Sequence, residues 1–120
     1  MAKMLVVDDS ASMRTMVAAT LKSAGHDVKD AENGQAALDI AKAGAFDAVI
    51  TDLNMPVMDG ISLTKELRAL AKYTYTPILL LTTESSDAKK AAGKAAGATG
   101  WLVKPFNPAK LLATIERVLG

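Results

Sequence analysis

The sequence contains no cysteine, so disulfide bonds and thiolate metal sites are excluded. Aromatic residues make up only 4% of the 120 residues, so a core must be built from aliphatic side chains and methionine. The formal net charge is +1 with no run of like charges, which argues against a nucleic-acid or membrane surface. No long apolar run opens the sequence, so neither a signal peptide nor a membrane span is expected there. We therefore expect a small cytoplasmic protein with one domain over residues 1–120.

Five short apolar runs recur along the chain, and each is followed by a segment with apolar residues at helical spacing. Strands that alternate with helices are typical of a parallel sheet covered by helices on both faces. The second run contains Lys29 and Asp30 and the fifth is short, so both are expected at sheet edges. The pattern predicts an α/β flavodoxin-like (βα)5 doubly wound sheet with strand order 2-1-3-4-5. The runs cover residues 4–7, 27–31, 48–50, 78–81 and 101–103.

Residues with a preference for helix ends flank several of the helical segments. Asp59 is placed to cap one helix, and Asn107 followed by Pro108 is placed to open the last one. The segment 85–98 is rich in alanine and offers no large apolar side chain, so we expect a weakly anchored helix. Because glycine costs about 0.5–1 kcal/mol in a helix, propensity alone predicts that Gly93→Ala stabilises the fold.

Aspartates end two of the predicted central strands. Asp8 and Asp9 follow the first run, and Asp52 follows the third. In the predicted strand order these two ends are neighbours, so three carboxylates should meet at one edge of the sheet. A helix-capping role explains one of these acids but not all three. Hard divalent cations prefer oxygen ligands, and the sequence therefore predicts a magnesium site there.

Two further polar residues end the last two strands. Thr82 closes the fourth run, and Lys104 follows the fifth. Both strand ends border the same edge of the predicted sheet. A hydroxyl and an ammonium group beside an acid-bound metal would together neutralise a phosphoryl group. Alone, each residue has a plainer interpretation, as a helix cap and a solvated surface charge.

The segments VVDDS, DLNMPVMDG, LLLTTES and GWLVKPF follow one another along the chain. In this order they resemble the signature motifs of the bacterial response-regulator receiver domain, and the likeness covers essentially the whole chain. Its stand-alone chemotaxis members are the most similar. The resemblance implies that Asp52 accepts a phosphoryl group from a histidine kinase (CheA-like). It also implies that Asp9, Asp52 and the Asn54 backbone carbonyl bind Mg²⁺ directly, while Asp8 assists through water.

The resemblance further implies roles outside the metal site. Lys104 pairs with the phosphorylated carboxylate, Thr82 moves towards the phosphoryl oxygens, and Trp101 stands where the family has a ring that changes rotamer. Asn54 and Glu84 occupy positions that tune hydrolysis of the phosphoryl group. The output surface is the fourth helix, fifth strand and fifth helix, which would bind a flagellar motor switch protein or another effector. We expect a monomer that assists its own phosphorylation and dephosphorylation but is not an enzyme acting on other substrates.

Two alternatives stay open at the level of sequence. A phosphorelay carrier or phosphate sink would use the same receiver chemistry with a different partner. An aspartate-dependent phosphatase or phosphotransferase also places an aspartate after a strand, but it needs a second acid two residues on. That position is Asn54, which cannot act as a general acid or base, so this alternative is remote.

Overall fold

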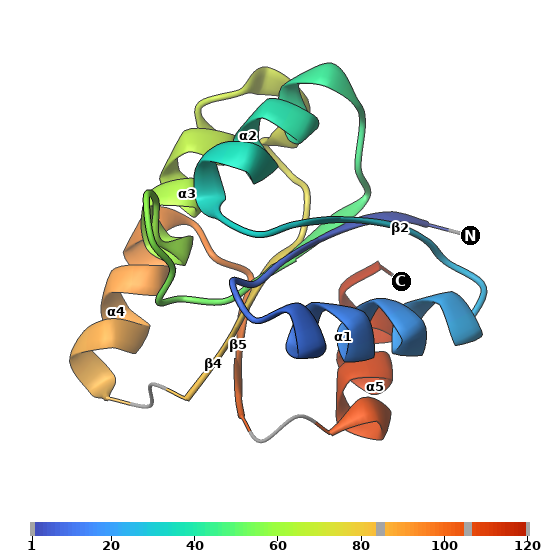
Figure 1. Cartoon of the computed structure of the whole chain (residues 1–120). Coiled ribbons are helices and arrows are strands. Elements are labelled where there is room, and N and C mark those ends of the chain that lie inside the picture. Colours follow the sequence, from blue (N-terminus) through green and yellow to red (C-terminus); the bar gives the residue numbers. More distant parts are fainter. Residues whose placement is uncertain (1, 84–85, 105–106, 120) are drawn as a thin grey trace.

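The structure, a computed structural model, describes residues 2–83, 86–104 and 107–119. Five parallel strands form one sheet in the order β2-β1-β3-β4-β5 (Figure 1). The flavodoxin-like architecture and strand order predicted from the sequence are therefore confirmed. The strands are β1 (Lys3–Val7), β2 (Asp27–Ala31), β3 (Ala48–Thr51), β4 (Ile78–Thr82) and β5 (Gly100–Val103).

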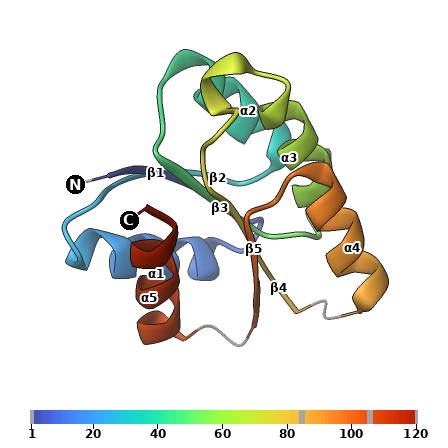
Figure 2. The same cartoon turned by 180° about the vertical axis from the view of Figure 1, so that it is seen from behind.

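Helices cover both faces of the sheet, as Figures 1 and 2 show from opposite sides. One face carries α1 (Ala11–Ser23) and α5 (Pro108–Leu119). The other carries α2 (Gly34–Ala43), α3 (Gly60–Arg68) and α4 (Asp87–Ala96), with a short 3-10 turn η1 (Ala71–Tyr73) before β4. No helix in the described ranges is both long and apolar enough to cross a membrane.

The two faces of the sheet bury separate clusters of side chains, because successive residues of a strand point to opposite sides. On β1, Leu5 and Val7 pack in the cluster with α2 and α3. Met4 and Val6, which alternate with them, pack in the cluster with α1 and α5. The central strands β1, β3 and β4 are thus buried along nearly their whole length, whereas the edge strands β2 and β5 are largely exposed or half-buried.

The predicted helix caps are present. The Asp59 carboxylate accepts a hydrogen bond from the Ser62 amide at 2.7 Å and caps α3. Asn107 Oδ1 accepts one from the Lys110 amide at 3.0 Å at the start of α5. The cap of α1 is Ser10, whose hydroxyl accepts from the Met13 amide. Since Ser10 serves as this cap, the acids before it are not needed for that purpose.

Gly93 is close-packed in a way that helix propensity does not take into account. It is buried in α4, and a Cβ atom added there would lie 2.9 Å from Leu80 Cδ1 and 3.1 Å from the Trp101 ring. The α4 helix is therefore held close to β4 and β5 by a residue without a side chain. The gain in helix propensity predicted for Gly93→Ala is therefore opposed by overpacking, since the added methyl group fits only if the Leu80 and Trp101 side chains shift.

Gly93→Ala is now expected to lower the free energy of unfolding by about 1 kcal/mol, because overpacking outweighs the gain in helix propensity. Denaturant unfolding of the purified chain measures the change. Ala91→Gly, at an exposed position of the same helix, is the control and should cost about 1 kcal/mol through propensity alone. A higher stability of Gly93→Ala would contradict the close-packing argument.

Candidate functional site

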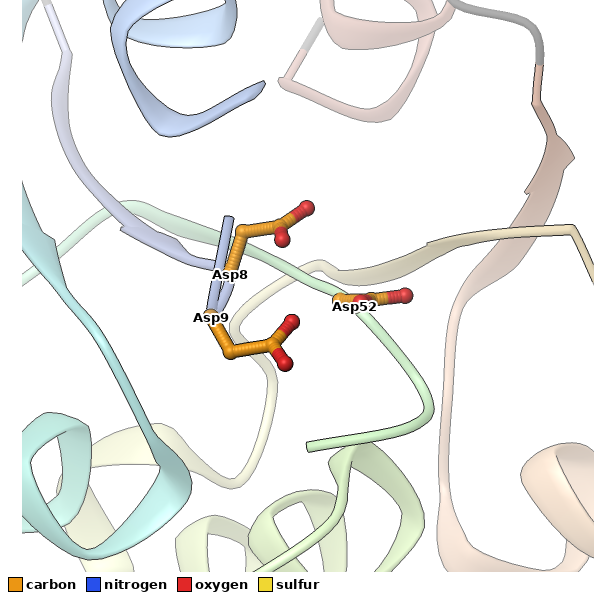
Figure 3. Close-up of side chains that lie close together, drawn as sticks. All are labelled: Asp8, Asp9 and Asp52. Atoms are coloured by element: carbon orange, nitrogen blue, oxygen red, sulfur yellow. The ribbon is translucent and has the colours of Figure 1, made fainter. Parts of the chain in front are cut away.

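Three aspartates meet at the carboxyl edge of the sheet, as the sequence predicts. Asp8 and Asp9 follow β1, and Asp52 follows β3, whose end is held beside β1 by a 2.8 Å hydrogen bond from the Asp52 amide to the Val7 carbonyl. One carboxylate oxygen from each aspartate lies within 4.8 Å of the others. Their carboxyl groups extend into the same space (Figure 3). The strand order therefore converts two separate sequence motifs into one acidic site.

The three carboxyl groups differ in exposure. Asp8 and Asp52 are only 3% and 8% exposed, whereas Asp9 is exposed. The Asp8 carboxylate accepts a hydrogen bond from the Ser10 amide at 2.9 Å, and Asp52 Oδ1 accepts one from the Leu53 amide at 2.8 Å. The carboxylates of Asp8 and Asp52 are therefore buried and hydrogen-bonded, and the site is open to solvent on the side of Asp9.

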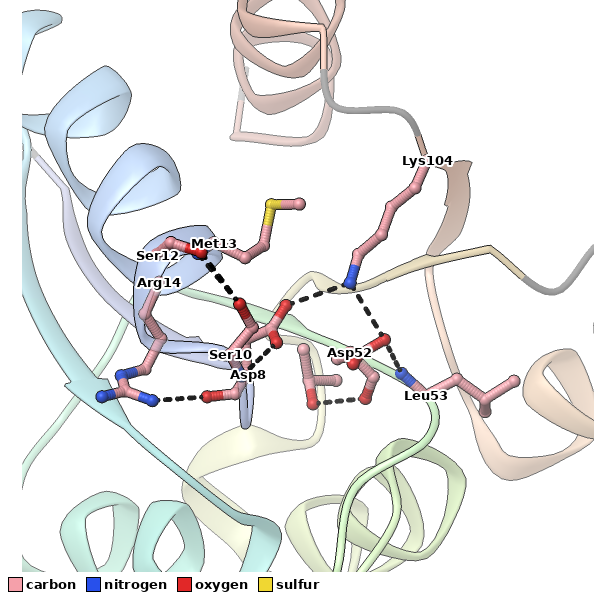
Figure 4. A network of polar contacts seen from close by, with 9 residues as sticks. Asp8, Ser10, Ser12, Met13, Arg14, Asp52, Leu53 and Lys104 are labelled. Carbon is pink, nitrogen blue, oxygen red and sulfur yellow. Dashed lines mark hydrogen bonds and ion pairs between the residues drawn. The ribbon is translucent and has the colours of Figure 1, made fainter.

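Lys104 is the cation of the site and reaches it from the end of β5 (Figure 4). Its Nζ lies 3.2 Å from Asp8 Oδ2 and 3.5 Å from Asp52 Oδ1. Burial, followed by the charge of Asp8, raises the pKa of the Asp52 carboxyl, while Lys104 and the Leu53 amide act in the opposite direction. Since the net direction is upward, one ammonium group does not offset burial and the neighbouring acid.

This donor set fits a magnesium ion. The residues offer carboxylate oxygens within 4.8 Å of one another, which is the ligand type that hard divalent cations prefer. Magnesium keeps several of its water molecules, and the exposed Asp9 side leaves the site accessible to water. A dication bound there would favour the ionised form of Asp52, whose pKa is raised by burial and by the charge of Asp8.

The other predicted site residues that the structure describes are Thr82, Trp101 and Asn54. Thr82 is fully buried at the end of β4, and its carbonyl accepts a 2.7 Å hydrogen bond from the Lys104 amide. Trp101 is half-buried on β5, where it contacts α4 at Gly93. Asn54 is exposed in the loop after β3, and Glu84 lies outside the described residues. The structure thus brings Asp8, Asp9, Asp52 and Lys104 together. Thr82 is joined to Lys104 by the hydrogen bond between their backbones.

Gly60 is a site residue whose role the sequence did not reveal. A Cβ atom on it would lie 2.2 Å from the Asp52 carbonyl oxygen and 3.1 Å from Leu53 Cα. The Gly60 amide also donates to the Leu53 carbonyl at 2.8 Å, and the Thr51 hydroxyl donates to the Asp52 carbonyl at 2.9 Å. The start of α3 therefore packs directly on the backbone that carries Asp52. The sequence does show a glycine directly after the capping residue Asp59. It does not show that this glycine packs against the backbone of Asp52.

The loop between β3 and α3 contains one unusual backbone conformation. Val57 has φ +72 and is 80% exposed, and it is the one non-glycine residue with positive φ in the described ranges. The left-handed conformation costs an L-residue about 1–2 kcal/mol, and the branched side chain of valine does not lower that cost. The turn that follows Asp52 and Asn54 therefore contains one strained residue, and a 2.8 Å hydrogen bond from the Met58 amide to the Pro56 carbonyl closes the chain across it.

Known proteins resemble the chain over nearly its full length. The model of the response regulator receiver domain matches residues 4–116. A chemotaxis protein CheY homolog of Campylobacter jejuni is 44% identical over 120 residues, which cover 98% of this chain and 92% of that protein. The crystallized chemotaxis protein CheY4 of Vibrio cholerae superposes with a TM-score of 0.96 at 56% identity, and the match covers 99% of both chains.

A further solved structure bears on the acidic site. It is the receiver domain of the Pseudomonas aeruginosa sensor histidine kinase PA1611, which matches with a TM-score of 0.92 at 32% identity and covers 99% of this chain and 98% of its own. That receiver domain has a magnesium ion coordinated in its active site cleft.

Proposed function

Since the chain belongs to the response regulator receiver domain family, we propose that it is a switch activated by phosphorylation at Asp52, with a histidine kinase as the phosphoryl donor. Its place is in a two-component system, and the CheY names of its relatives suggest chemotaxis. The observation that carries the assignment of Asp52 is its position. It is a nearly buried carboxylate with a raised pKa, between two further aspartates and Lys104. We further propose that residues 1–120 form one receiver domain.

The transfer follows from the contacts of Asp52. Its Oδ1 accepts from the Leu53 amide and faces Lys104, so we assign Oδ2 as the attacking oxygen. A bond forms between this oxygen and phosphorus, the bond from phosphorus to the phosphohistidine nitrogen breaks, and the imidazole leaves with its electron pair and takes up a proton. Lys104 Nζ, 3.5 Å from Asp52 Oδ1, is placed to pair with the new negative charge.

Asp8, Asp9, Asp52 and the backbone carbonyl of Asn54 are the groups that would hold Mg²⁺, with Asp8 acting through water. The bound ion would neutralise charge on the transferred phosphoryl group. The donor chemistry of the three carboxylates and the magnesium in the P. aeruginosa receiver domain support this assignment. Asn54 has no carboxyl group to activate water, so the phosphoryl group should outlast a catalytic turnover, with Glu84 as a second residue that sets its lifetime.

The output is proposed to leave through the face formed by α4, β5 and α5. Thr82, at the end of β4, would move towards the phosphoryl oxygens, and Trp101 would respond to the space that it vacates. The contact between Trp101 and Gly93 supports a path from β5 to α4. A flagellar motor switch protein is the proposed target, and a relay carrier or phosphate sink is the alternative.

Labelling with a small acyl phosphate tests the function. In the presence of Mg²⁺ the purified chain should gain one phosphoryl group, detected as a single mass increase that alkali removes. Without a divalent ion the increase should be absent, because the single ammonium group of Lys104 does not offset the charge of three carboxylates. Trp101 emission, followed in the same reaction, should change with the label and respond differently in Thr82→Ala.

Two outcomes would count against these proposals. Labelling that proceeds equally well with a chelator present would remove magnesium from the mechanism. Constant Trp101 emission during full labelling would remove Trp101 from the switch but leave the phosphoacceptor in place.

A further inference from the structure

Arg14 connects the acidic site to the edge strand β2, although it does not belong to the cluster of aspartates and Lys104. It lies in α1, and its guanidinium Nη1 donates to the backbone carbonyl of Asp8 at 2.8 Å (Figure 4). Its Nε lies 3.5 Å from Oδ2 of Asp30 on β2. The Arg14 side chain is 19% exposed, whereas that of Asp30 is 53% exposed.

The hydrogen bond to Asp8 has a clear structural reason. In a strand, the amide and the carbonyl of one residue point towards the same neighbour. The Asp8 amide donates to the Ala31 carbonyl of β2 at 3.2 Å, so the Asp8 carbonyl also faces β2. Because β2 ends at Ala31, the ladder offers no further amide there, and Arg14 supplies the donor.

From this geometry we infer that Arg14 is a positioning residue for the metal-binding acids, a role that rests on the proposed function of the site. A peptide unit is planar, so fixing the Asp8 carbonyl also fixes the direction in which the chain enters Asp9. Within the described part of the chain, no hydrogen bond or ion pair holds the Asp9 carboxylate itself. Its direction towards Asp52 therefore depends on the backbone that Arg14 fixes.

If Arg14 acts only through its charge, its loss should raise the affinity for Mg²⁺, whereas if it positions the acids, its loss should lower that affinity. A guanidinium near three carboxylates repels a dication, so removing its charge should strengthen Mg²⁺ binding if charge alone matters. If Arg14 positions the acids, its removal should weaken binding instead. Groups behind the metal ligands typically change metal affinity by about 10–100-fold when mutated. The sign of the change thus identifies the role.

The experiment measures Mg²⁺ affinity of the full chain by isothermal titration calorimetry at pH 7. Arg14→Gln should bind Mg²⁺ about tenfold more weakly than the wild type. Arg14→Lys keeps the charge and one donor and should recover part of the affinity. Lys22→Gln is the matched control, since it removes one positive charge from an exposed position at the other end of α1 and should change affinity by less than about twofold.

Two further measurements keep the inference testable if Arg14→Gln folds poorly. One uses the variant Asp30→Asn, and the other tests whether additional Mg²⁺ restores labelling of Arg14→Gln. Asp30→Asn leaves Arg14 charged but loosens its anchor, and it should weaken Mg²⁺ binding in the same direction by a smaller factor. Labelling of Arg14→Gln should reach the wild-type rate once the Mg²⁺ concentration is raised about tenfold, which a general loss of structure would not allow.

The outcomes separate this inference from the proposed function. Equal or tighter Mg²⁺ binding by Arg14→Gln would overturn the positioning role, even if wild-type labelling proceeds normally. Wild-type protein that binds Mg²⁺ but takes no label would overturn the proposed function, while the ranking of the variants would still decide the role of Arg14. A wild type that binds no Mg²⁺ would overturn both.

Discussion

Replacing Asp52 with Asn is expected to abolish labelling by an acyl phosphate and, at the same time, to raise the free energy of unfolding at pH 7. Labelling is lost because an amide is not a nucleophile towards phosphorus. Stability rises because the wild-type carboxylate is nearly buried and lies beside Asp8, and an uncharged side chain removes both penalties. Intact-mass measurement follows the label, and denaturant unfolding without Mg²⁺ follows the stability.

The pH dependence of this stability gain follows from the direction of the pKa shift. Burial and Asp8 raise the pKa of folded Asp52 above 3.8, so the folded state binds the proton more tightly than the unfolded chain. Ionisation of Asp52 therefore destabilises the fold as the pH rises through the folded pKa. The gain from Asp52→Asn should be complete above that pKa and should disappear as the pH falls below 3.8, where the unfolded carboxyl becomes protonated as well.

Added Mg²⁺ should reduce the difference in stability between Asp52→Asn and the wild type. A ligand at 100 times its dissociation constant stabilises the folded state by about 2.7 kcal/mol, and Asp52→Asn forfeits part of that gain. Asp39→Asn is the control, since it makes the same chemical change on an exposed residue of α2 and should leave labelling intact. A label that persists on Asp52→Asn, or a stability that does not rise at pH 7, would contradict the assignment.

Of the glycine-to-alanine substitutions near the site, Gly60→Ala should destabilise the fold most. Its Cβ would lie 2.2 Å from the Asp52 carbonyl oxygen, and the atoms in conflict are backbone, which cannot rotate away. We expect a loss of about 3 kcal/mol in the free energy of unfolding and a drop of about 10 °C in Tm. Since relief requires a shift of α3 or of the Asp52 backbone, Mg²⁺ affinity should fall as well.

Gly44→Ala provides the comparison for Gly60. An added Cβ at Gly44 would lie 3.3 Å from the Phe46 ring and 3.5 Å from the Ile40 carbonyl oxygen, and its backbone, with φ -124, suits alanine. Its stability should change by less than about 1 kcal/mol, and Mg²⁺ binding should be unchanged. Calorimetric melting of both variants checks the prediction. Similar melting temperatures for the two would show that the start of α3 yields without cost.

The site was predictable from the sequence as far as its charged residues are concerned. Asp8, Asp9 and Asp52 stand at the ends of apolar runs, and strand order alone places those ends side by side. Lys104 could be placed at the same edge for the same reason. Gly60 and Arg14 could not be assigned, because their partners, the carbonyl groups of Asp52 and Asp8, belong to backbone that is not distinctive in the sequence.

The sequence by itself determined the strands, the helices and their order, because these follow from the spacing of apolar residues within short segments and from local caps such as Asp59 and Asn107. Only the tertiary structure decided how closely the elements approach one another. Propensity made Gly93 a weakness of α4, whereas the nearness of Leu80 and Trp101 leaves little room for a larger residue there. The reason is that periodicity is a property of neighbours along the chain. A contact between α4 and β5, or between α3 and the end of β3, depends on the relative position of separate elements, which no local pattern specifies.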